Sequence, residues 1–354
     1  DTHYSYQSAS WLEQNSLWEN DSLVLAPDFI AISGDVVEHP YEEPQGMELA
    51  YNHLGSLGTP LVFTCGNHDQ KMLSVWRHYF GPIYSTARFD DVSIISFDSS
   101  LPIGSGIMNW LSTQSRKSVQ YGPTFLMCHY PPQHEYFTFG GLGVLNIMEE
   151  QQVTGILSGH IHMDYLADVQ SIKEHVMSGD DDLKLKNIAN QFDDTGAYLN
   201  PITKPLVIIT RTAAKNGYTA YEPASPHYAG YRRLSVTNNV VSNYTYDYDD
   251  DGTRDPQVCV PNGQFETSVV SDSGNWIWSC NSQFNEDLNM IRAIVKIPNP
   301  SVGMKWDLVS SNKTNGAYIR ACVSDDSTTL IDARCSIDEN SNVCLEFTEV
   351  LEEA

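Results

Sequence analysis

Basic residues are scarce in this chain. Its 354 residues include 20 lysines and arginines against 45 aspartates and glutamates, which gives a formal net charge of -25. So acidic a protein repels the phosphate backbone of DNA and RNA, whose binding depends on lysine and arginine. The composition therefore disfavours a dedicated role in nucleic-acid binding.

Long hydrophobic runs are also missing. No apolar stretch approaches the roughly 20 residues that a helix needs to cross a bilayer, and no basic segment followed by an apolar one resembles a leader peptide. We expect a soluble chain with no membrane span, whose targeting peptide was removed or never existed. At 41% apolar residues it can bury a substantial core, and its length favours one large domain and one smaller one.

Cysteine is rare before residue 259 and concentrated after it. Cys65 and Cys128 lie in apolar runs, where small buried thiols are common. The other five are Cys259, Cys280, Cys322, Cys335 and Cys344. Five cysteines in so short a stretch predict two disulfides and one thiol left over, which favours an oxidising compartment.

Three sequons agree with an extracellular or secretory location. The candidate N-glycosylation sites are Asn20, Asn243 and Asn312, each followed two residues later by Ser or Thr. Such triplets also arise by chance, so secretion is an expectation that rests on the cysteines and the sequons together.

Short apolar runs alternate with helical segments up to about residue 245. Residues 45–57 and 105–118 space their apolar side chains three and four apart, as helices packed on a sheet do. The strand-like runs are 29–33, 61–65, 92–97, 124–128, 155–158 and 205–210. The pattern predicts an α/β fold, with a layered β-sheet core flanked by helices and strands buried on both faces.

Three other segments interrupt this alternation. Residues from about 166 to 203 are polar and rich in aspartate, which predicts an insertion on the surface of a domain spanning residues 1–245. Residues 246–258 form an acidic linker. From 259 to 354 the helical signal vanishes, and short strands with Ser, Asn and Gly turns predict a separate all-β, sandwich-like domain.

Metal-binding and acid–base residue types stand at the ends of the apolar runs. They are Asp35, Asn67, His68, Asp69, His129, His160 and His162. Because ligands bind at the carboxyl ends of strands in open α/β sheets, these residues are expected to meet at one edge of the fold. Glycine precedes them at Gly34, Gly66 and Gly159, which suits tight turns with a close backbone approach.

The order Asp-x-His, Gly-Asp, Gly-Asn-His-Asp, His and Gly-His-x-His resembles the calcineurin-like metallophosphoesterase superfamily, with Asp1-Thr2-His3 as its first motif. The resemblance covers residues 1 to about 245. It implies a first metal held by Asp1, His3, Asp35 and His162. Asp35 would bridge to a second metal, held also by Asn67, His129 and His160. Mixed nitrogen and oxygen ligands suit Fe, Zn or Mn rather than Mg or Ca.

The same resemblance implies hydrolysis of phosphoesters. Two cations about 3.5–4 Å apart acidify a bridging water and neutralise phosphate oxygens, so a metal-bound hydroxide would be the nucleophile. His68 would protonate the leaving oxygen or stabilise the transition state, and Asp69 would orient His68. Whether the substrate is a monoester or a diester stays open.

Two features depart from the superfamily pattern. An apolar strand usually leads into the Asp-x-His motif, and nothing precedes Asp1 here. We expect upstream residues that the sequence omits, or a strand supplied from elsewhere, such as a neighbouring subunit. Glu38 stands where purple acid phosphatases carry an iron-binding tyrosine, so the chain is more similar to the phosphodiesterase and general phosphoesterase branches.

The acidic linker also carries a candidate calcium loop. Asp247, Asp249, Asp251 and Asp255 follow the first part of an EF-hand spacing, with Gly252 at the sixth position. Val258 replaces the glutamate that closes such a loop. The alternative is a solvated acidic linker of the kind found at domain boundaries.

Two classes of function fit the sequence. The first is a secreted metal-dependent phosphoesterase whose β domain docks substrate, a surface or a partner. The second is a structural or adhesive subunit of an extracellular assembly that keeps the phosphoesterase fold and self-associates through strand donation or the β domain. A purely structural subunit gains nothing from keeping seven ligands, so the sequence favours the enzyme.

Overall fold

The computed structural model describes most of the first two-thirds of the chain and the strands of the last third. The described residues are 1–41, 43, 45–134, 137–162, 164–178, 197–198, 205–214, 228–237, 240–243, 259–272, 275–298, 305–311, 318–325 and 328–350. Two compact units divide the chain: unit 1 is Asp1–Ser16 with Asp28–Asn262, and unit 2 is Leu17–Pro27 with Gly263–Ala354. Within the described ranges, no helix is long and apolar enough to cross a membrane.

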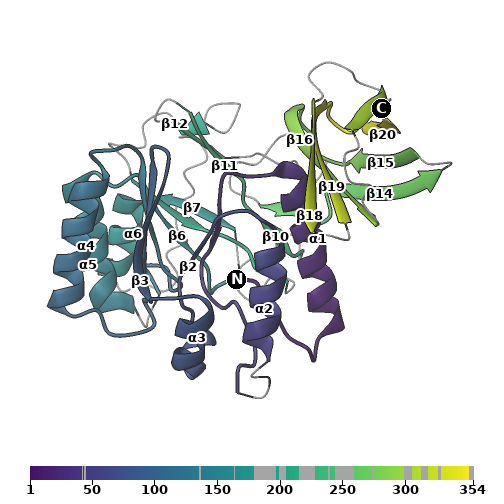
Figure 1. Cartoon of the computed structure of the whole chain (residues 1–354). Coiled ribbons are helices and arrows are strands. Elements are labelled where there is room, and N and C mark those ends of the chain that lie inside the picture. Colours follow the sequence, from purple (N-terminus) through teal and green to yellow (C-terminus); the bar gives the residue numbers. More distant parts are fainter. Residues whose placement is uncertain are drawn as a thin grey trace. The chain divides into compact units, whose positions relative to one another are not determined.

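A mixed six-stranded sheet forms the centre of unit 1 (Figure 1). Its four inner strands are parallel, and an antiparallel strand closes each edge. In spatial order the strands are β3 (Tyr84–Phe89), β4 (Val92–Phe97), β5 (Thr124–Met127), β6 (Gly155–Ser158), β9 (Leu206–Ile209) and β7 (Tyr165–Asp168). The four parallel strands are apolar runs that the sequence predicts, so the α/β prediction is confirmed for this unit.

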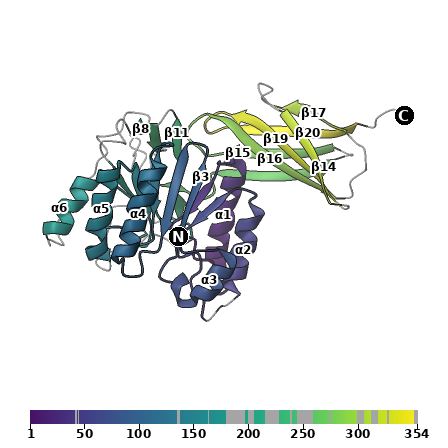
Figure 2. The same ribbon diagram turned by 60° about the vertical axis from the view of Figure 1, so that its left-hand side comes forward.

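Both faces of this sheet are buried. On one face Phe97, Leu126 and Ile209 pack with residues of three helices. Those helices, α4 (Ser105–Ser118), α5 (Thr138–Gln151) and α6 (Val169–Ser178), lie side by side over that face in Figures 1 and 2. On the other face Ile94, Phe125 and Ile208 form a second apolar cluster. Burial on both faces explains why these strands are continuously apolar instead of alternating.

A smaller parallel sheet carries two of the site motifs. Its strands β1 (Ile30–Ile32) and β2 (Leu61–Phe63) pair in register. Helix α2 (Gly46–Ser56) joins them, and the 3-10 helix η1 (Asp69–Met72) and helix α3 (Leu73–Tyr79) follow β2. Short strands complete the unit: β8 (Ala197–Tyr198), β11 (Leu234–Thr237) and β12 (Val240–Asn243) in one sheet, and β10 (Gly230–Tyr231) with β13 (Val260–Pro261) in another.

The start of the predicted insertion belongs to the core instead. Strand β7 pairs with β9 at the edge of the large sheet, and α6 buries Val169 and Ile172 against the same core. The sequence prediction of a surface insertion from about 166 was therefore wrong for residues 166–178. Polar neighbours in "DVQSIKEH" hid the three-residue spacing of the two buried side chains. Most of the remaining predicted insertion lies outside the described residues.

Helix α1 (Ala9–Leu25) is not predicted by its sequence, because two of its fully buried residues are polar. Asn15 donates its side-chain N–H to the carbonyl of Thr2 in unit 1. Asp21, in unit 2, accepts the backbone N–H groups of Gly263, Gln264 and Phe265 at 2.8–3.1 Å. Residues 17–27 therefore belong to the same unit as the C-terminal strands. The sequence predicts that this β domain starts only at residue 259.

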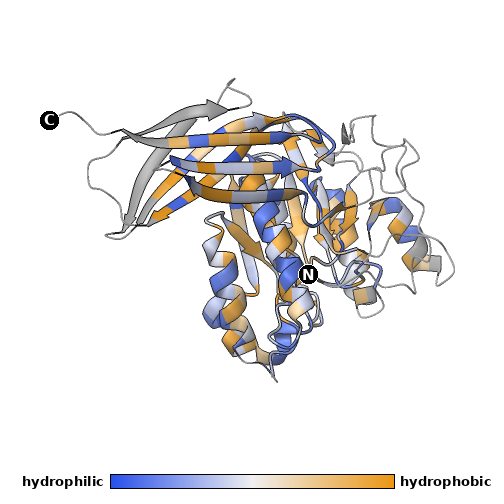
Figure 3. Ribbon diagram, turned by 90° about the vertical axis from the view of Figure 1, so that its right-hand side faces the viewer, coloured by the Kyte–Doolittle hydropathy of each residue, from blue (hydrophilic) through white to orange (hydrophobic). Residues whose placement is uncertain are grey.

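Unit 2 consists of two antiparallel sheets in its described C-terminal part. The first contains β14 (Phe265–Asp272), β15 (Asn275–Ser282), β20 (Asn342–Val350) and β17 (Lys305–Ser311); the second contains β16 (Leu288–Pro298), β19 (Thr328–Ile337) and β18 (Tyr318–Asp325). Hydrophilic and hydrophobic residues alternate along several of these strands (Figure 3). In β19, for example, Ile331, Ala333 and Cys335 are buried while the residues between them are partly exposed. One face of the strand therefore packs inward.

The expected disulfides do not form among the described cysteines. Six of the seven are free thiols, and the side chain of Cys322 lies outside the described residues. Of the five cysteines from residue 259 onward, Cys259 belongs to unit 1 and the other four belong to unit 2. Cys280 and Cys344 lie on neighbouring strands, but their register partners are Val343 and Ser279, so their side chains face opposite sides of the sheet. An oxidising compartment stays a prediction.

The structure describes the side chain of one of the three candidate glycosylation sites. Asn20 lies within α1, where its side-chain N–H donates to the carbonyl of Phe265 at 2.7 Å and its oxygen accepts the hydroxyl of Thr267. A glycan on that nitrogen would displace the first of these bonds, so the folded chain disfavours modification there. The side chains of Asn243 and Asn312 lie outside the described residues, as do all four aspartates of the candidate calcium loop.

Replacing Asp21 by alanine tests its role in unit 2. The change leaves three backbone N–H groups without their charged acceptor, and we expect it to lower the free energy of unfolding by about 3 kcal/mol. Urea denaturation followed by tryptophan fluorescence measures the loss. Asp28→Ala, at an exposed position, is the control and should change stability by less than about 0.5 kcal/mol. Equal stability of the two variants would contradict this role.

Candidate metal centre

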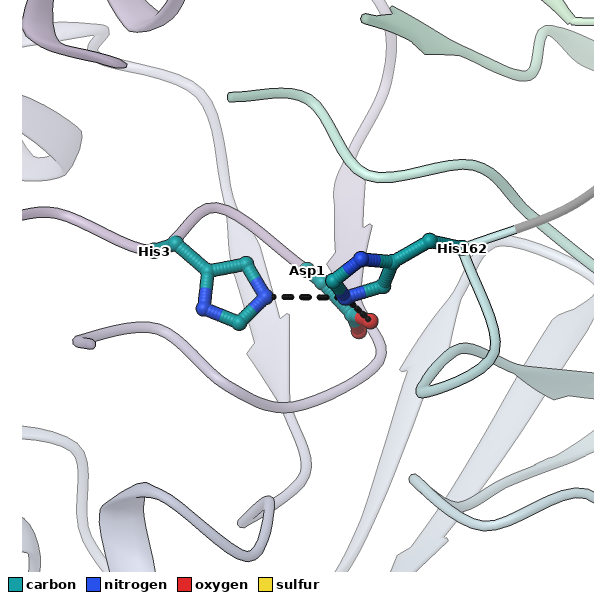
Figure 4. Close-up of side chains that lie close together, drawn as sticks. All are labelled: Asp1, His3 and His162. Carbon is teal, nitrogen blue, oxygen red and sulfur yellow. Dashed lines mark hydrogen bonds and ion pairs between the residues drawn. The ribbon is translucent and has the colours of Figure 1, made fainter. Parts of the chain in front are cut away.

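The motif residues meet at the carboxyl ends of the strands. The first cluster joins Asp1, His3 and His162, although about 160 residues separate His162 from the other two (Figure 4). Nε2 of His162 lies 3.0 Å from Nε2 of His3 and 3.3 Å from a carboxylate oxygen of Asp1. Each of the three offers one ligand atom within 4.8 Å of the others. The cluster matches three of the four residues that the sequence assigns to the first metal.

The second cluster joins Asp35, His129 and His160 under the same criterion. Nε2 of His129 lies 3.2 Å from Asp35 Oδ2 and 3.2 Å from Nδ1 of His160. It also lies 3.0 Å from the side-chain oxygen of Asn67. The residues that the sequence assigns to the second metal are thus together.

Main-chain groups connect the two clusters. The N–H of His160 donates to Asp1 Oδ2 at 2.7 Å, so a residue of the second cluster holds the carboxylate of the first. Within the second cluster, the carbonyl of Ser33 accepts Nδ1–H of His129 at 2.9 Å. This bond leaves Nε2 of the ring to face the cluster, because the nitrogen of a metal-binding histidine that points away from the metal usually donates its hydrogen to a carbonyl or carboxylate.

The glycines before the motif residues leave room for side chains from other motifs. A Cβ on Gly34 would lie 2.5 Å from the ring of His129, and φ at Gly34 is +101°. A Cβ on Gly66 would overlap the Asp35 carboxylate, and one on Gly159 would overlap the carboxylate of Asp1. The expected close backbone approach is confirmed at all three positions.

Four of the clustered residues have left-handed backbone conformations. Their φ angles are 46° at His3, 46° at Asp35, 66° at His160 and 53° at His162. Residues other than glycine rarely adopt such angles, each costs about 1–3 kcal/mol, and they gather at functional sites. The surrounding hydrogen bonds must hold these residues in place against that strain.

Burial and charge set the protonation of the centre. Burial alone would raise the pKa of Asp35, but His129, His3 and His68 together hold it well below its ordinary value. Burial and the neighbouring His129 and His134 lower the pKa of His160 to about 2. Both groups therefore keep the form that binds a cation, a carboxylate and a neutral imidazole.

Asp69 does not orient His68, contrary to the sequence prediction. Its buried carboxylate accepts the backbone N–H groups of Gly66, Val36 and Val37 at 2.9–3.2 Å, and so joins the turn after β1 to the turn after β2. Burial and the charge of Asp35 raise the pKa of Asp69 to about 7, although these backbone donors oppose the shift. The ring of His68 is held by the carbonyl of Glu38, which accepts its Nδ1–H at 2.7 Å.

Sequence analysis missed Glu38 as part of the centre. Its carboxylate is buried and lies 2.6 Å from Nδ1 of His3. The sequence signal is its position three residues after Asp35, where purple acid phosphatases carry an iron-binding tyrosine.

The donor set fits transition-metal ions. With Nδ1 of His129 committed to a carbonyl, its Nε2 faces oxygens of Asn67 and Asp35 and a ring nitrogen of His160. These groups all offer lone pairs, and a cation among them satisfies them together. Oδ1 of Asp1 is buried and accepts no hydrogen bond from the described residues. It therefore has lone pairs available for a cation in the first cluster.

Comparison with known families agrees with this geometry. Residues 1–164 match the model of the calcineurin-like phosphoesterase family. The match covers somewhat less than half of the chain. It contains every clustered residue described above, so the resemblance drawn from the motifs is confirmed for this part of the chain. The branch of the superfamily stays a prediction.

Three solved structures align with the chain at low identity. A dimetal phosphatase from Danio rerio aligns at 10% identity and a TM-score of 0.43, covering 73% of this chain and 90% of its own. Family 30 xylanases from Clostridium acetobutylicum and Clostridium papyrosolvens align at 9% identity with TM-scores of 0.22 and 0.16, covering 95% of this chain and 92% of theirs. None is similar enough to assign a function. No curated protein matches the chain.

Substituting Gly159 by alanine tests the packing of the first cluster. The new methyl group would displace the carboxylate of Asp1 while leaving every ligand residue in the sequence. We expect Zn²⁺ affinity to fall by at least the roughly 10–100-fold typical of lost contacts around a metal.

Competition with a chromophoric chelator measures that affinity. Gly55→Ala is the control, because a Cβ at Gly55 meets nothing within 4 Å. Unchanged Zn²⁺ binding by Gly159→Ala would show that Asp1 is not a ligand.

Proposed function

We propose that unit 1 is a metal-dependent phosphoesterase with a binuclear centre. The observation that carries the proposal is the meeting of the two ligand clusters within one segment that matches the calcineurin-like phosphoesterase model. A third group of possible ligands, His3, Glu38 and His68, shares His3 with the first cluster. Asp1, His3 and His162 would hold one ion, His129, His160 and Asn67 would hold the other, and the carboxylate of Asp35 would be available to both. When bound, two Fe, Zn or Mn ions would neutralise the phosphate and acidify a water molecule.

The chain's own groups bind, orient and protonate the substrate. His68 donates its Nδ1–H to the carbonyl of Glu38, and its Nε2 lies 3.8 Å from Asp35 Oδ2. The ring is partly exposed, with 22% of its side chain accessible. A protonated His68 therefore presents Nε2–H beside the centre, where it donates its proton to the leaving oxygen of the ester.

The substrate class within phosphoesters stays open between monoester and diester. His134 stacks on Tyr130 with ring centroids 4.7 Å apart, and both rings meet His160 edge-on at 4.5 and 4.3 Å. This aromatic wall borders the second cluster through His160. A docking role for unit 2 and self-association stay predictions.

Two substitutions separate metal binding from proton transfer. His68→Ala keeps every proposed ligand, so it should bind about two transition-metal ions per chain while kcat falls by about 10²–10⁴-fold. Asp35→Ala removes the bridge and should lose both metal and activity. Elemental analysis and assays on a chromogenic monoester and diester measure the two effects.

The exposed His78 provides the control, because His78→Ala removes an imidazole that belongs to none of the motifs and should leave metal content and rate unchanged. A wild-type protein that binds two ions without hydrolysing either ester would favour the structural-subunit alternative. Full activity of the wild type after removal of all metal would refute the proposal.

A further inference from the structure

Glu38 occupies a central place beside the first cluster. Its side chain is buried, and its Oε2 lies 2.6 Å from Nδ1 of His3 and 3.6 Å from Nδ1 of His68. Its main chain is fixed as well: the N–H donates to the carbonyl of Tyr4 at 3.2 Å, and the carbonyl accepts from His68 at 2.7 Å. One residue therefore contacts a proposed ligand through its carboxylate, and the proposed acid through its main-chain carbonyl and, at a longer distance, the same carboxylate.

We propose that Glu38 is a positioning residue that prepares His3 for metal binding through its carboxylate and aligns His68 through its main-chain carbonyl. The inference rests on the proposed function, since it gives the two histidines the roles argued above.

The carboxylate fixes which nitrogen of His3 faces the cluster. A carboxylate oxygen 2.6 Å from Nδ1 favours the tautomer with the ring hydrogen on Nδ1, which leaves the lone pair on Nε2. That Nε2 is the atom 3.0 Å from Nε2 of His162, on the side of the ring where the ligand atoms gather. A carboxylate on the outer nitrogen also makes the ring a stronger ligand.

The same contact counters the strain at His3. The backbone of His3 has a φ of 46°, and its N–H is held by the carbonyl of Asp35 at 2.9 Å. Main-chain bonding fixes the backbone, and the His3 ring packs among the rings of Trp11, His68 and His162. The Glu38 carboxylate adds a charged contact at Nδ1, which favours one orientation of that ring.

Substitution separates the side-chain contacts from the main-chain one. Glu38→Ala removes the carboxylate from His3 and from the longer contact with His68, but keeps the carbonyl that accepts from His68. Glu38→Gln keeps an oxygen that accepts Nδ1–H of His3 while removing the charge. A positioning role therefore predicts a graded effect on the first metal site, greater for alanine than for glutamine.

Titration of the metal-free protein with Zn²⁺ alone, in competition with a chromophoric chelator, tests this. Wild type should bind about two ions. Glu38→Ala should keep one site unchanged and weaken the other by about 10–100-fold, and Glu38→Gln should recover much of that loss. At saturating Zn²⁺ the rate of Glu38→Ala on a chromogenic phosphoester should approach that of wild type, with KM unchanged.

Glu48→Ala, at an exposed position of α2, is the matched control, and thermal unfolding of each metal-free variant reports on the fold. Two wild-type sites in Glu38→Ala would overturn the inference and leave the proposed function standing. Equal weakening of both sites in both variants, with a lowered unfolding temperature, would also overturn it, because Glu38 would then only support the fold. A wild type that binds no Zn²⁺ and hydrolyses no ester would instead overturn the proposed function.

Discussion

The turn that carries Asp35 is the constraint on which the rest of the centre depends. Its carbonyl accepts the N–H groups of Thr2 and His3, which places the Asp-x-His segment. The next two N–H groups, of Val36 and Val37, donate to Asp69 and fix the turn after β2. The Asp35 side chain in turn accepts the N–H of His68 at 2.9 Å. One turn of backbone thus organises residues from three motifs.

This arrangement explains how a strained and highly charged site is stable. Left-handed φ angles at His3, Asp35, His160 and His162 persist because backbone hydrogen bonds and close packing against glycines leave these residues no alternative position. The carboxylates of Asp35 and Asp69 share the small buried region, and three N–H donors hold Asp69 in it. The rigid sheets supply the fixed strand ends from which these turns start.

The sequence predicted the elements that the core demands and the residues that the chemistry demands. Strands such as Val92–Phe97 are mostly apolar and buried throughout because both sides of the sheet are covered, and His129 and His160 stand two residues after such strands. Helix α1 escaped prediction because its buried positions include Asn15 and Asp21, whose partners are backbone groups distant in sequence. The roles of Asp69 and Glu38 depend on which backbone groups face them in the fold, and residue type alone does not determine this.

The central claim is that two cations share Asp35, and electron paramagnetic resonance of the metal-free protein reconstituted with Mn²⁺ tests it most directly. Two ions about 3.5–4 Å apart, bridged by one carboxylate, couple their spins. The account predicts the spectrum of a coupled manganese pair at two equivalents, lost in Asp35→Ala. A spectrum of isolated ions alone at every ratio of Mn²⁺ to protein would contradict it.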